Sequence, residues 1–286
     1  MMKMLQQGDQ ANFGRRQSGT QPTVAHVQRR SRLRYFVMLI SLPIVAFLAV
    51  KFVTGKATFS YHVTFSGNEP NLSQVLDECG GKNGTTPDLQ IAACSTLIES
   101  GRGNDRGLSV AFYDRGNAYQ QKGDFDHAIA DYDQAIRHSP GMSGAFGNRG
   151  TAYQAKGQYA LAVADYNEAI RINPKYAMAL QNRCWVRFVM GQLSDALADC
   201  DESLRLRPNS ALAFNARGFV HLKMGALDMA SVDFVAALAS DPMLASALYG
   251  RGLAKQKQGA PGDVDIAAAK AKSPGIAKQY AHYGIE

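Results

Sequence analysis

Charged residues are sparse in this sequence, and the side chains that most enzymes use for chemistry are few and scattered. Only 19% of the 286 residues are charged, and there are one Trp, four Cys and six His. The sequence has no H-E-x-x-H, G-x-S-x-G, C-x-x-C-H or phosphate-binding P-loop motif, and no His lies at zinc-ligand spacing. We therefore predict that the protein is not an enzyme and uses no cofactor, metal ion or small-molecule substrate.

Net charge is almost absent outside the first 34 residues. The whole chain carries +7, and residues 1–34, with seven Lys or Arg and one Asp, account for +6 of it. A basic tail on a near-neutral body does not provide the positive surface that nucleic acids require. We expect no nucleic-acid partner.

Long apolar stretches are also absent, with one exception near the N-terminus. Residues 35–50 contain no charged side chain, and Phe52 and Val53 extend the stretch past Lys51. This length is near the lower limit for a transmembrane helix. The basic residues before it favour a cytoplasmic N-terminus. We predict a cytoplasmic tail at 1–34 and a single-pass signal anchor at 35–53 in a bacterial inner membrane, with the repeat domain in the periplasm.

Two alternatives for this apolar stretch stay open. In the first, it is a cleaved signal peptide, which leaves a secreted or periplasmic protein. In the second, the protein is soluble and cytoplasmic. The sequence has no A-x-A site just after the apolar stretch, which favours the anchor over the cleaved peptide.

A repeat with a period of 34 residues runs from Ser109 to Leu244 without an insertion. Steps of 34 connect Gly116, Gly150, Cys184, Gly218 and Gly252, and likewise Arg115, Arg149, Arg183, Arg217 and Arg251. Ala128 and Pro140 recur in a similar way. A constant period of this size is typical of solenoids, in which each unit packs only on its neighbours.

The first unit reads R-G-x-x-Y, then K-G-x-F-x-x-A, then D-Y, A and P. This order resembles the tetratricopeptide repeat (TPR). The resemblance covers four units, 109–142, 143–176, 177–210 and 211–244, and a degenerate fifth repeat with a C-terminal cap follows at 245–286. It implies an all-α fold, a right-handed superhelical solenoid of helix-turn-helix repeats whose concave groove binds a partner protein or peptide. The flanking segments resemble those of exported or membrane-anchored bacterial TPR proteins.

The residues between the apolar stretch and the repeats are predicted to be a linker and a cap. Residues 54–87 are the linker, with a short strand at Thr58–Phe65. Residues 88–108 are an N-terminal capping helix and a loop, because apolar residues recur at helical spacing from Leu89 to Ile98. The open end of a solenoid requires such a cap.

The resemblance also indicates which residues line the concave groove. They are polar in the first half, and mainly apolar and aromatic in the second: Tyr113, Asn117, Asn148 and Asn182, then Met178, Trp185, Phe188, Leu212, Phe219 and Leu222. We expect Asn148 and Asn182 to bind the backbone of an extended peptide, and Trp185 to anchor the partner. The basic pair with which some TPR proteins hold a C-terminal carboxylate is missing. In the alternative interpretation, Trp185 and Phe188 pack against neighbouring helices or the C-terminal cap.

The repeated Arg is matched by an Asp in the second half of each unit. We predict that each Asp binds the Arg of the following unit, in the pairs Asp131–Arg149, Asp165–Arg183, Asp199–Arg217 and Asp233–Arg251. Arg115 would then have no Asp partner, and in the fifth unit Ala267 replaces the Asp. Such pairs fix the register between units more than they add stability. The alternative is a basic stripe that binds anions.

The four cysteines all follow the apolar stretch, which fits export to an oxidising compartment. Cys184 and Cys200 replace a Gly and an aromatic residue of the same unit, and we predict that they form a disulfide. Cys79 and Cys94 flank a loop rich in Gly, Asn and Thr, and we predict a second disulfide there. Buried free thiols are the alternative.

Two functions from different classes fit these observations. The first is a non-enzymatic scaffold, tethered to the membrane, that binds a partner protein or peptide in the concave groove. The second is a structural subunit of an envelope assembly, in secretion, cytochrome maturation or cell-wall synthesis. In that assembly, the membrane helix would contact the other subunits.

Overall fold

The structure is a computed structural model that describes residues 50–53, 56–59, 71–82, 84–101 and 104–285. The chain divides into two units, Met1–Asn71 and Leu72–Glu286. In the first unit, strands β1 (Val50–Val53) and β2 (Lys56–Phe59) pair antiparallel, with Val50 opposite Phe59.

The hairpin corrects one end of the predicted transmembrane segment. Residues 35–49 of that segment lie outside the described residues, but Val50–Val53 form a strand and do not continue a helix. Val and Phe favour strands, and only Thr54 and Gly55 separate β1 from β2 in sequence, which suits a tight hairpin. The strand expected from Thr58 begins earlier, at Lys56. Among the described residues, no helix combines the length and apolar character needed to cross a membrane.

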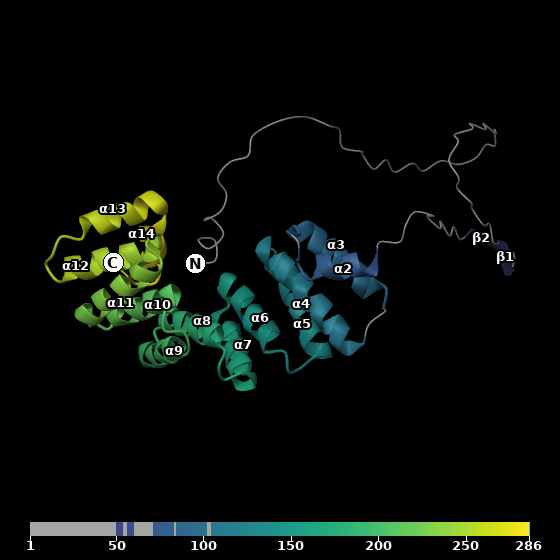
Figure 1. Ribbon diagram of the computed structural model, residues 1–286, viewed down its shortest axis with the longest axis horizontal. Helices are drawn as coiled ribbons and strands as arrows, with labels where there is room; N and C mark the ends of the chain where they lie inside the picture. Colours follow the sequence, from purple (N-terminus) through teal and green to yellow (C-terminus); the bar gives the residue numbers. More distant parts are fainter. Residues whose placement is uncertain (1–49, 54–55, 60–70, 83, 102–103, 286) are drawn as a thin grey trace, which may run out of the picture. The chain divides into compact units, whose positions relative to one another are not determined.

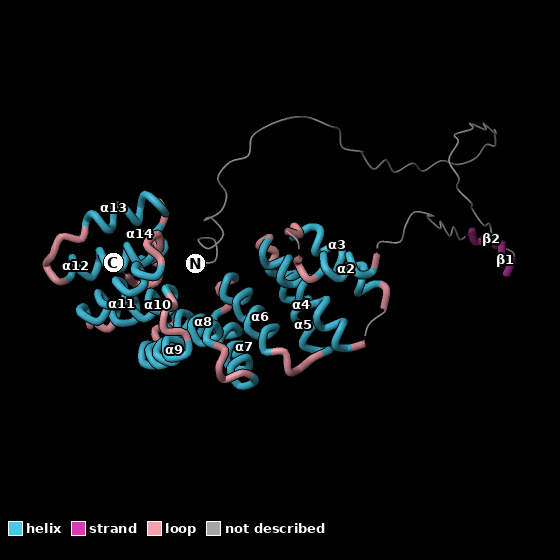
Figure 2. The backbone as a smooth tube through the Cα atoms, in the orientation of Figure 1, coloured by secondary structure: helices cyan, strands magenta, loops and turns pink. Residues whose placement is uncertain are grey.

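The second unit is helical throughout its described residues (Figures 1 and 2). Its helices are α2 (Leu72–Cys79), α3 (Pro87–Glu99), α4 (Asp105–Gln121), α5 (Phe125–His138), α6 (Ser143–Ala155), α7 (Tyr159–Ile172), α8 (Ala177–Val189), α9 (Leu193–Leu206), α10 (Ala211–Lys223), α11 (Leu227–Ser240), α12 (Ala245–Lys257), α13 (Asp263–Lys272) and α14 (Ile276–Ala281). The pairs α4–α5, α6–α7, α8–α9 and α10–α11 fall in the four predicted repeats.

Helix α2 lies inside the segment 54–87, which was predicted to be a linker. Its apolar residues Leu72, Val75, Leu76 and Cys79 recur at helical spacing, and Val75 and Cys79 are buried. They pack with Ala93 and Cys94 of α3 and with Ala111 of α4 in a small core. The N-terminal cap is therefore a pair of helices.

The first helices of successive repeats contact one another, and this places them on the inner side of the solenoid. Contacts join α4 to α6, α6 to α8, α8 to α10 and α10 to α12, whereas the corresponding second helices are not in such contact within the described unit. The first helices therefore line the concave groove. Each ends before a Gly with a φ of 72° to 78°, which other residues adopt at a cost: Gly123, Gly157, Gly191, Gly225 and Gly259.

A glycine in the first helix lets an aromatic ring of the second helix pack directly on the backbone. A Cβ atom on Gly116 would lie 2.8 Å from the Tyr132 ring, and one on Gly218 would lie 2.8 Å from the Phe234 ring. Tyr132 and Phe234 are fully buried. The repeated Gly thus sets the spacing within each helix pair.

The fifth repeat is a regular helix pair whose second helix is shifted by two residues. Ile266 packs on Gly252, fourteen residues earlier, where the other repeats use a spacing of sixteen. Asp265 takes the place of the repeated Asp and binds Arg251 at 2.6 Å. The prediction that Ala267 replaces this Asp is therefore wrong, because α13 faces α12 at a spacing two residues shorter than in the other repeats.

Candidate partner-binding groove

The N-terminal half of the groove is polar, and tyrosines of the second helices hold its polar groups in place. The Tyr132 hydroxyl has one proton to donate, and two acceptors lie within reach of it, Asn117 Oδ1 at 2.9 Å and Gln120 Oε1 at 3.2 Å. In the next repeat, the Tyr166 hydroxyl contacts Gln154 Oε1 at 2.9 Å. Burial raises the pKa of both tyrosines well above the usual range, so both hydroxyls stay protonated and donate.

The two asparagines predicted to bind a peptide belong to this network. Asn148 Nδ2 donates to Asn117 Oδ1 at 2.7 Å and to the Tyr113 hydroxyl at 3.1 Å. Asn182 Nδ2 donates to Thr151 Oγ1 at 3.3 Å. All these groove residues are half-buried, so they are held by protein contacts and remain open to solvent. Amide groups in such an arrangement match the N–H and C=O groups of an extended peptide.

The C-terminal half of the groove is aromatic, and the change occurs at equivalent positions. Trp185 and Phe188 stand where the earlier repeats have Asn117 and Gln120 or Thr151 and Gln154. Phe219 and Leu222 follow in the fourth repeat. The second helices contribute Cys200 and Phe234 here, which carry no hydroxyl group, so the polar network stops at the third repeat.

The aromatic half is not an open surface, because the C-terminal residues cover it. Trp185 is 4% exposed, and Phe188 and Phe219 are 0% exposed. The Trp185 ring centroid lies 6.0 Å from that of Tyr280 and 5.5 Å from that of Tyr283, and the Phe219 ring stacks on Tyr280 at 4.4 Å.

The predicted groove residues therefore fall into two groups. Tyr113, Asn117, Asn148 and Asn182 come together in the open polar half, and Met178 is 43% exposed. Trp185, Phe188, Phe219 and Leu222 are buried, Leu212 is half-buried, and the expectation that they form an exposed patch is corrected. The alternative, in which Trp185 and Phe188 pack against neighbouring helices or the C-terminal cap, describes the structure: Trp185 contacts the cap, and Phe188 contacts Phe219 of the neighbouring helix α10.

Two sets of tyrosines in the groove were not predicted from the sequence. Tyr280 and Tyr283 cover the aromatic half, and Tyr132 and Tyr166 hold the side chains of the polar half in place. The signal for the first was the pair Tyr280 and Tyr283 in a segment otherwise read as a plain cap. The signal for the second was the coincidence of a Tyr in the second helix with an amide or hydroxyl side chain at Asn117 or Thr151 in the first.

The repeated Arg binds the Asp of its own unit, so the predicted pairing with the following unit is wrong. Arg149 contacts Asp165 at 2.6 Å, and Arg183 contacts Asp199 at 2.5 Å. The pairs Arg115–Asp131 and Arg217–Asp233 follow the same rule, so Arg115 also has a partner. Sixteen residues is the spacing at which the two helices of one repeat face each other, which explains the choice.

Contact between units is made by the Nη1 atom of three of these arginines. Arg149 Nη1 reaches back to Asp133 at 2.5 Å, Arg183 Nη1 to Asn167 at 2.7 Å, and Arg217 Nη1 to Asp201 at 2.7 Å. Each of these partners lies two residues after the repeated Asp of the preceding unit. The arginines are thus neutralised, which disfavours the alternative of an anion-binding stripe.

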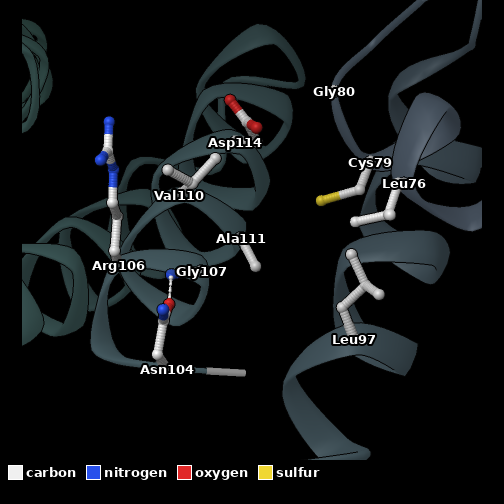
Figure 3. Close-up of a pocket in the computed structure, with 10 residues that line it drawn as sticks. All are labelled: Leu76, Cys79, Gly80, Leu97, Asn104, Arg106, Gly107, Val110, Ala111 and Asp114. Carbon is white, nitrogen blue, oxygen red and sulfur yellow. Dashed lines mark hydrogen bonds between the residues drawn. The ribbon is translucent and has the colours of Figure 1, made fainter. Parts of the chain in front are cut away.

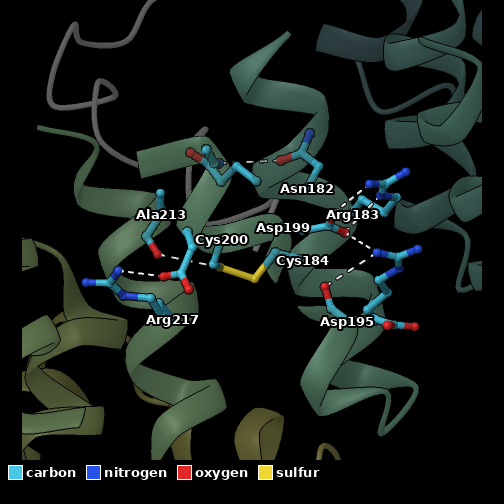
Figure 4. Close-up of a disulfide and its surroundings, with 12 residues drawn as sticks. Asn182, Arg183, Cys184, Asp195, Asp199, Cys200, Ala213 and Arg217 are labelled. Atoms are coloured by element: carbon cyan, nitrogen blue, oxygen red, sulfur yellow. Dashed lines mark hydrogen bonds and ion pairs between the residues drawn. A yellow bond between two sulfur atoms is a disulfide. The ribbon is translucent and has the colours of Figure 1, made fainter. Parts of the chain in front are cut away.

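Both predicted cysteine pairs lie at bonding distance. The S–S distance is 2.08 Å for Cys79–Cys94 and 2.01 Å for Cys184–Cys200. The second disulfide joins α8 to α9 next to the Arg183–Asp199 ion pair (Figure 4). It takes the place of the glycine and aromatic ring that pack together in other repeats.

A pocket of about 340 Å³ lies at the N-terminal end of the solenoid, between α4 and the pair α2 and α3 (Figure 3). Its walls are apolar and include Leu76, Leu97 and Val110. Asp114 also lines it, and burial raises the pKa of this carboxyl group to about 6. Among the described residues, no group of side chains that would hold a metal ion is found.

The helix pairs form a solenoid whose groove has an open polar half and an aromatic half that the C-terminal residues cover. Comparisons with known proteins identify the fold. Residues 113–177 match the family model described as tetratricopeptide repeat. None of the curated proteins matches the sequence. The described helical unit has the fold of TPR solenoids.

Several solved structures resemble the chain in fold, although they share little sequence with it. YrrB, described as a TPR protein with an unusual peptide-binding site, has a TM-score of 0.51 at 21% identity over 64% of this chain and 93% of its own. A tetratricopeptide repeat protein from Parabacteroides merdae has a TM-score of 0.56 at 17% identity over 74% and 79%. MamA from Desulfovibrio magneticus RS-1 has a TM-score of 0.51 at 16% identity over 62% and 98%.

Proposed function

We propose that this protein is a non-enzymatic scaffold that binds an extended segment of a partner protein in the polar half of its concave groove. The observation that carries the proposal is the network of Asn117, Asn148, Thr151 and Asn182, which is held by buried tyrosines and yet remains half-exposed. Side chains fixed in this way lose little conformational entropy when they bind a peptide backbone. The peptide-binding site of the similar protein YrrB supports the same use of the fold.

We further propose that the apolar stretch from residue 35 up to the strand β1 tethers the scaffold to a bacterial inner membrane and that the repeats work in the periplasm, or that signal cleavage releases them there. The disulfides support this location, because they persist in oxidising compartments and are rare in the cytosol. The basic tail at residues 1–34 supports the orientation.

A structural subunit of an envelope assembly is the second candidate. It is favoured by an exposed apolar face on α11, a second helix that points away from the groove. Met229, Val232 and Val235 on this helix are 59%, 68% and 53% exposed. A face of this kind suits contact with another protein outside the groove.

Site-specific photo-crosslinking in cells that make the protein distinguishes the two functions. A crosslinking side chain at Met178, in the groove, is compared with one at Ala164, which is exposed on the second helix α7. The scaffold function predicts that Met178 captures a partner that Ala164 does not, and that Asn148→Ala abolishes the capture. The assembly function predicts capture from Val232 that Asn148→Ala leaves unchanged.

A further inference from the structure

The segment 276–285 occupies the aromatic half of the groove in the manner of a bound peptide. Tyr280 is 1% exposed, and its ring lies among the rings of Trp185, Phe219 and Tyr249. Tyr283, three residues later, meets the Trp185 ring edge to face. Ile276 and Ile285, which are 0% and 3% exposed, are buried at the two ends of the segment.

The opposite side of this segment is exposed to solvent. Lys278, Ala281, His282 and Gly284 are all exposed, so the segment is a strip on the groove and is not enclosed by it. Helix α14 within it has six residues, and a helix of that length is not stable in isolation. The segment therefore holds its conformation through tertiary contacts, with the groove residues and with α12 and α13 of the fifth repeat.

The aromatic residues under the segment are not needed to build the repeats. The first two repeats fold with Asn117, Gln120, Thr151 and Gln154 at the positions where the third and fourth have Trp185, Phe188, Phe219 and Leu222. The aromatic set therefore serves the occupant of the groove, because aromatic side chains in a groove anchor bound peptides.

One contact beneath the segment points to an exchangeable occupant. Lys223 Nζ donates to the main-chain carbonyl of Tyr283 at 2.8 Å, a contact that any peptide backbone supplies. The fully buried Asn215 side chain lies beside Tyr280.

We infer that residues 276–285 are an internal ligand of the groove, which a partner peptide of similar chemistry displaces. This inference rests on the proposed scaffold function and specifies its partner. The displacing segment is short and helical and presents two aromatic side chains three residues apart, flanked by aliphatic ones. Displacement would join the aromatic half to the open polar half and give the partner the full length of the groove.

The single Trp of the chain reports on this exchange, since Trp185 lies directly under Tyr283. The variant Lys223→Ala/Tyr283→Ala in the full chain removes the carbonyl contact and one ring, and it leaves the fully buried Tyr280 and Ile276 unchanged. The matched control is Lys278→Ala/His282→Ala, which changes two exposed residues of the same segment. The probes are a synthetic peptide of residues 274–286 and the same peptide with both tyrosines replaced by Ala.

We expect acrylamide quenching of Trp185 to rise severalfold in the Lys223→Ala/Tyr283→Ala variant and to stay at the wild-type level in the control. The natural peptide should restore the shielding of Trp185 in a saturable way, and the Ala peptide should not. Unfolding monitored by circular dichroism at the same time verifies that the repeats remain folded. In the wild type, the peptide should bind much more weakly, because the competent state is a small fraction of the population.

Three results would overturn the inference. Trp185 could stay shielded in the variant, or become exposed only together with loss of helix, and either result would make the segment a fixed part of the core. A concentration-dependent dimer with shielded Trp185 would instead assign the groove to a second copy of the chain. Crosslinking from Met178 uses an exposed position that the segment 276–285 does not bury, so its failure removes the proposed function without deciding the outcome for Trp185.

Discussion

Cys184 and Cys200 are bonded at the two positions where the fourth repeat packs the backbone of one helix against an aromatic ring of the other. Gly218 and Phe234 hold those positions in the fourth repeat, and a Cβ atom on the glycine would lie 2.8 Å from the ring. The disulfide thus replaces a steric fit with a covalent bond at the same point of the helix pair. The third repeat is therefore the one whose packing depends on oxidation.

The double variant Cys184→Gly/Cys200→Phe tests this relationship. It restores the pair found in the fourth repeat. Phe suits this site better than Tyr, because Trp185 and Phe188 stand where the first repeat has Asn117 and Gln120, the acceptors for the Tyr132 hydroxyl group. A bridge across this loop contributes about 3 kcal/mol. We expect reduction to destabilise the wild type by about that amount beyond its effect on the variant, as measured by urea unfolding with and without dithiothreitol.

A control for the disulfide is Cys184→Ser/Cys200→Ser, which removes the bond without filling the space. It should be less stable than the Gly/Phe variant under reducing conditions. Equal stability of the two variants would mean that the ring contributes nothing at this position, and the structural equivalence would then be wrong.

Arg149 binds one Asp in its own repeat and another Asp in the preceding repeat, so the two kinds of contact can be tested one at a time. Asp165, its partner in the same unit, has a side chain that is 8% exposed, and Asp133, its partner in the preceding unit, is 42% exposed. Loss of one partner of a buried pair costs about 3–5 kcal/mol, whereas an exposed pair contributes about 0–1 kcal/mol. We expect Asp165→Ala to lower the free energy of unfolding far more than Asp133→Ala in urea titrations.

The substitution that lowers the free energy of unfolding more identifies the ion pair that contributes more to the stability of the solenoid. If Asp133→Ala is the more harmful change, the contact between units dominates and the ion pairs act mainly as connectors. The matched substitution at Asp201, which binds Arg217 from the preceding unit and is 55% exposed, should behave as Asp133→Ala does.

The helix pairs and their boundaries could be predicted because they depend on local rules, whereas the pairing of side chains could not. A period of 34 fixes which residues are equivalent, but it leaves open whether an Arg binds forward or within its unit. The spacing of sixteen between Arg149 and Asp165 becomes decisive only when the two helices face each other. In the fifth repeat, Asp265 faces Arg251 at a spacing of fourteen residues, and strict counting by 34 misses it.

The groove could be located from the sequence, but the sequence did not predict that the C-terminal segment covers half of it. The equivalent positions correctly place Asn148 and Trp185 on the inner helices. Whether Trp185 faces solvent depends on where a segment almost a hundred residues later in the chain packs, and its sequence pattern indicates only a short helix. Long-range contacts of this kind leave no local signal other than the two tyrosines, Tyr280 and Tyr283.

The burial of Trp185 predicts an effect on stability that a residue in an open groove would not have. Trp185→Ala removes a large side chain with 4% exposure, and such truncations cost about 3–5 kcal/mol. Met178→Ala, in the same helix and 43% exposed, should change the free energy of unfolding by less than about 0.5 kcal/mol. Thermal unfolding of the two variants checks this, and similar midpoints would contradict the covered groove.

Asp114 makes the stability of the N-terminal cap depend on pH. Burial raises the pKa of its carboxyl group from 3.8 to about 6, and no ion pair or hydrogen bond to it is found among the described residues. The folded state therefore binds this proton more tightly than the unfolded state does. Stability from this group is fully present below pH 3.8 and is lost as the pH rises to about 6.

Replacing Asp114 with Asn removes the charge and keeps the shape of the side chain. We expect Asp114→Asn to unfold at a higher urea concentration than the wild type at pH 7, and the difference to shrink towards zero as the pH falls to 4, because the wild-type carboxyl group is then mostly protonated in the fold. Asp195→Asn, an exposed carboxylate in the first turn of α9, provides a control that should not show this pattern. An Asp114→Asn variant that is no more stable than the wild type at pH 7 would mean that solvent or a bound cation compensates the charge in the pocket.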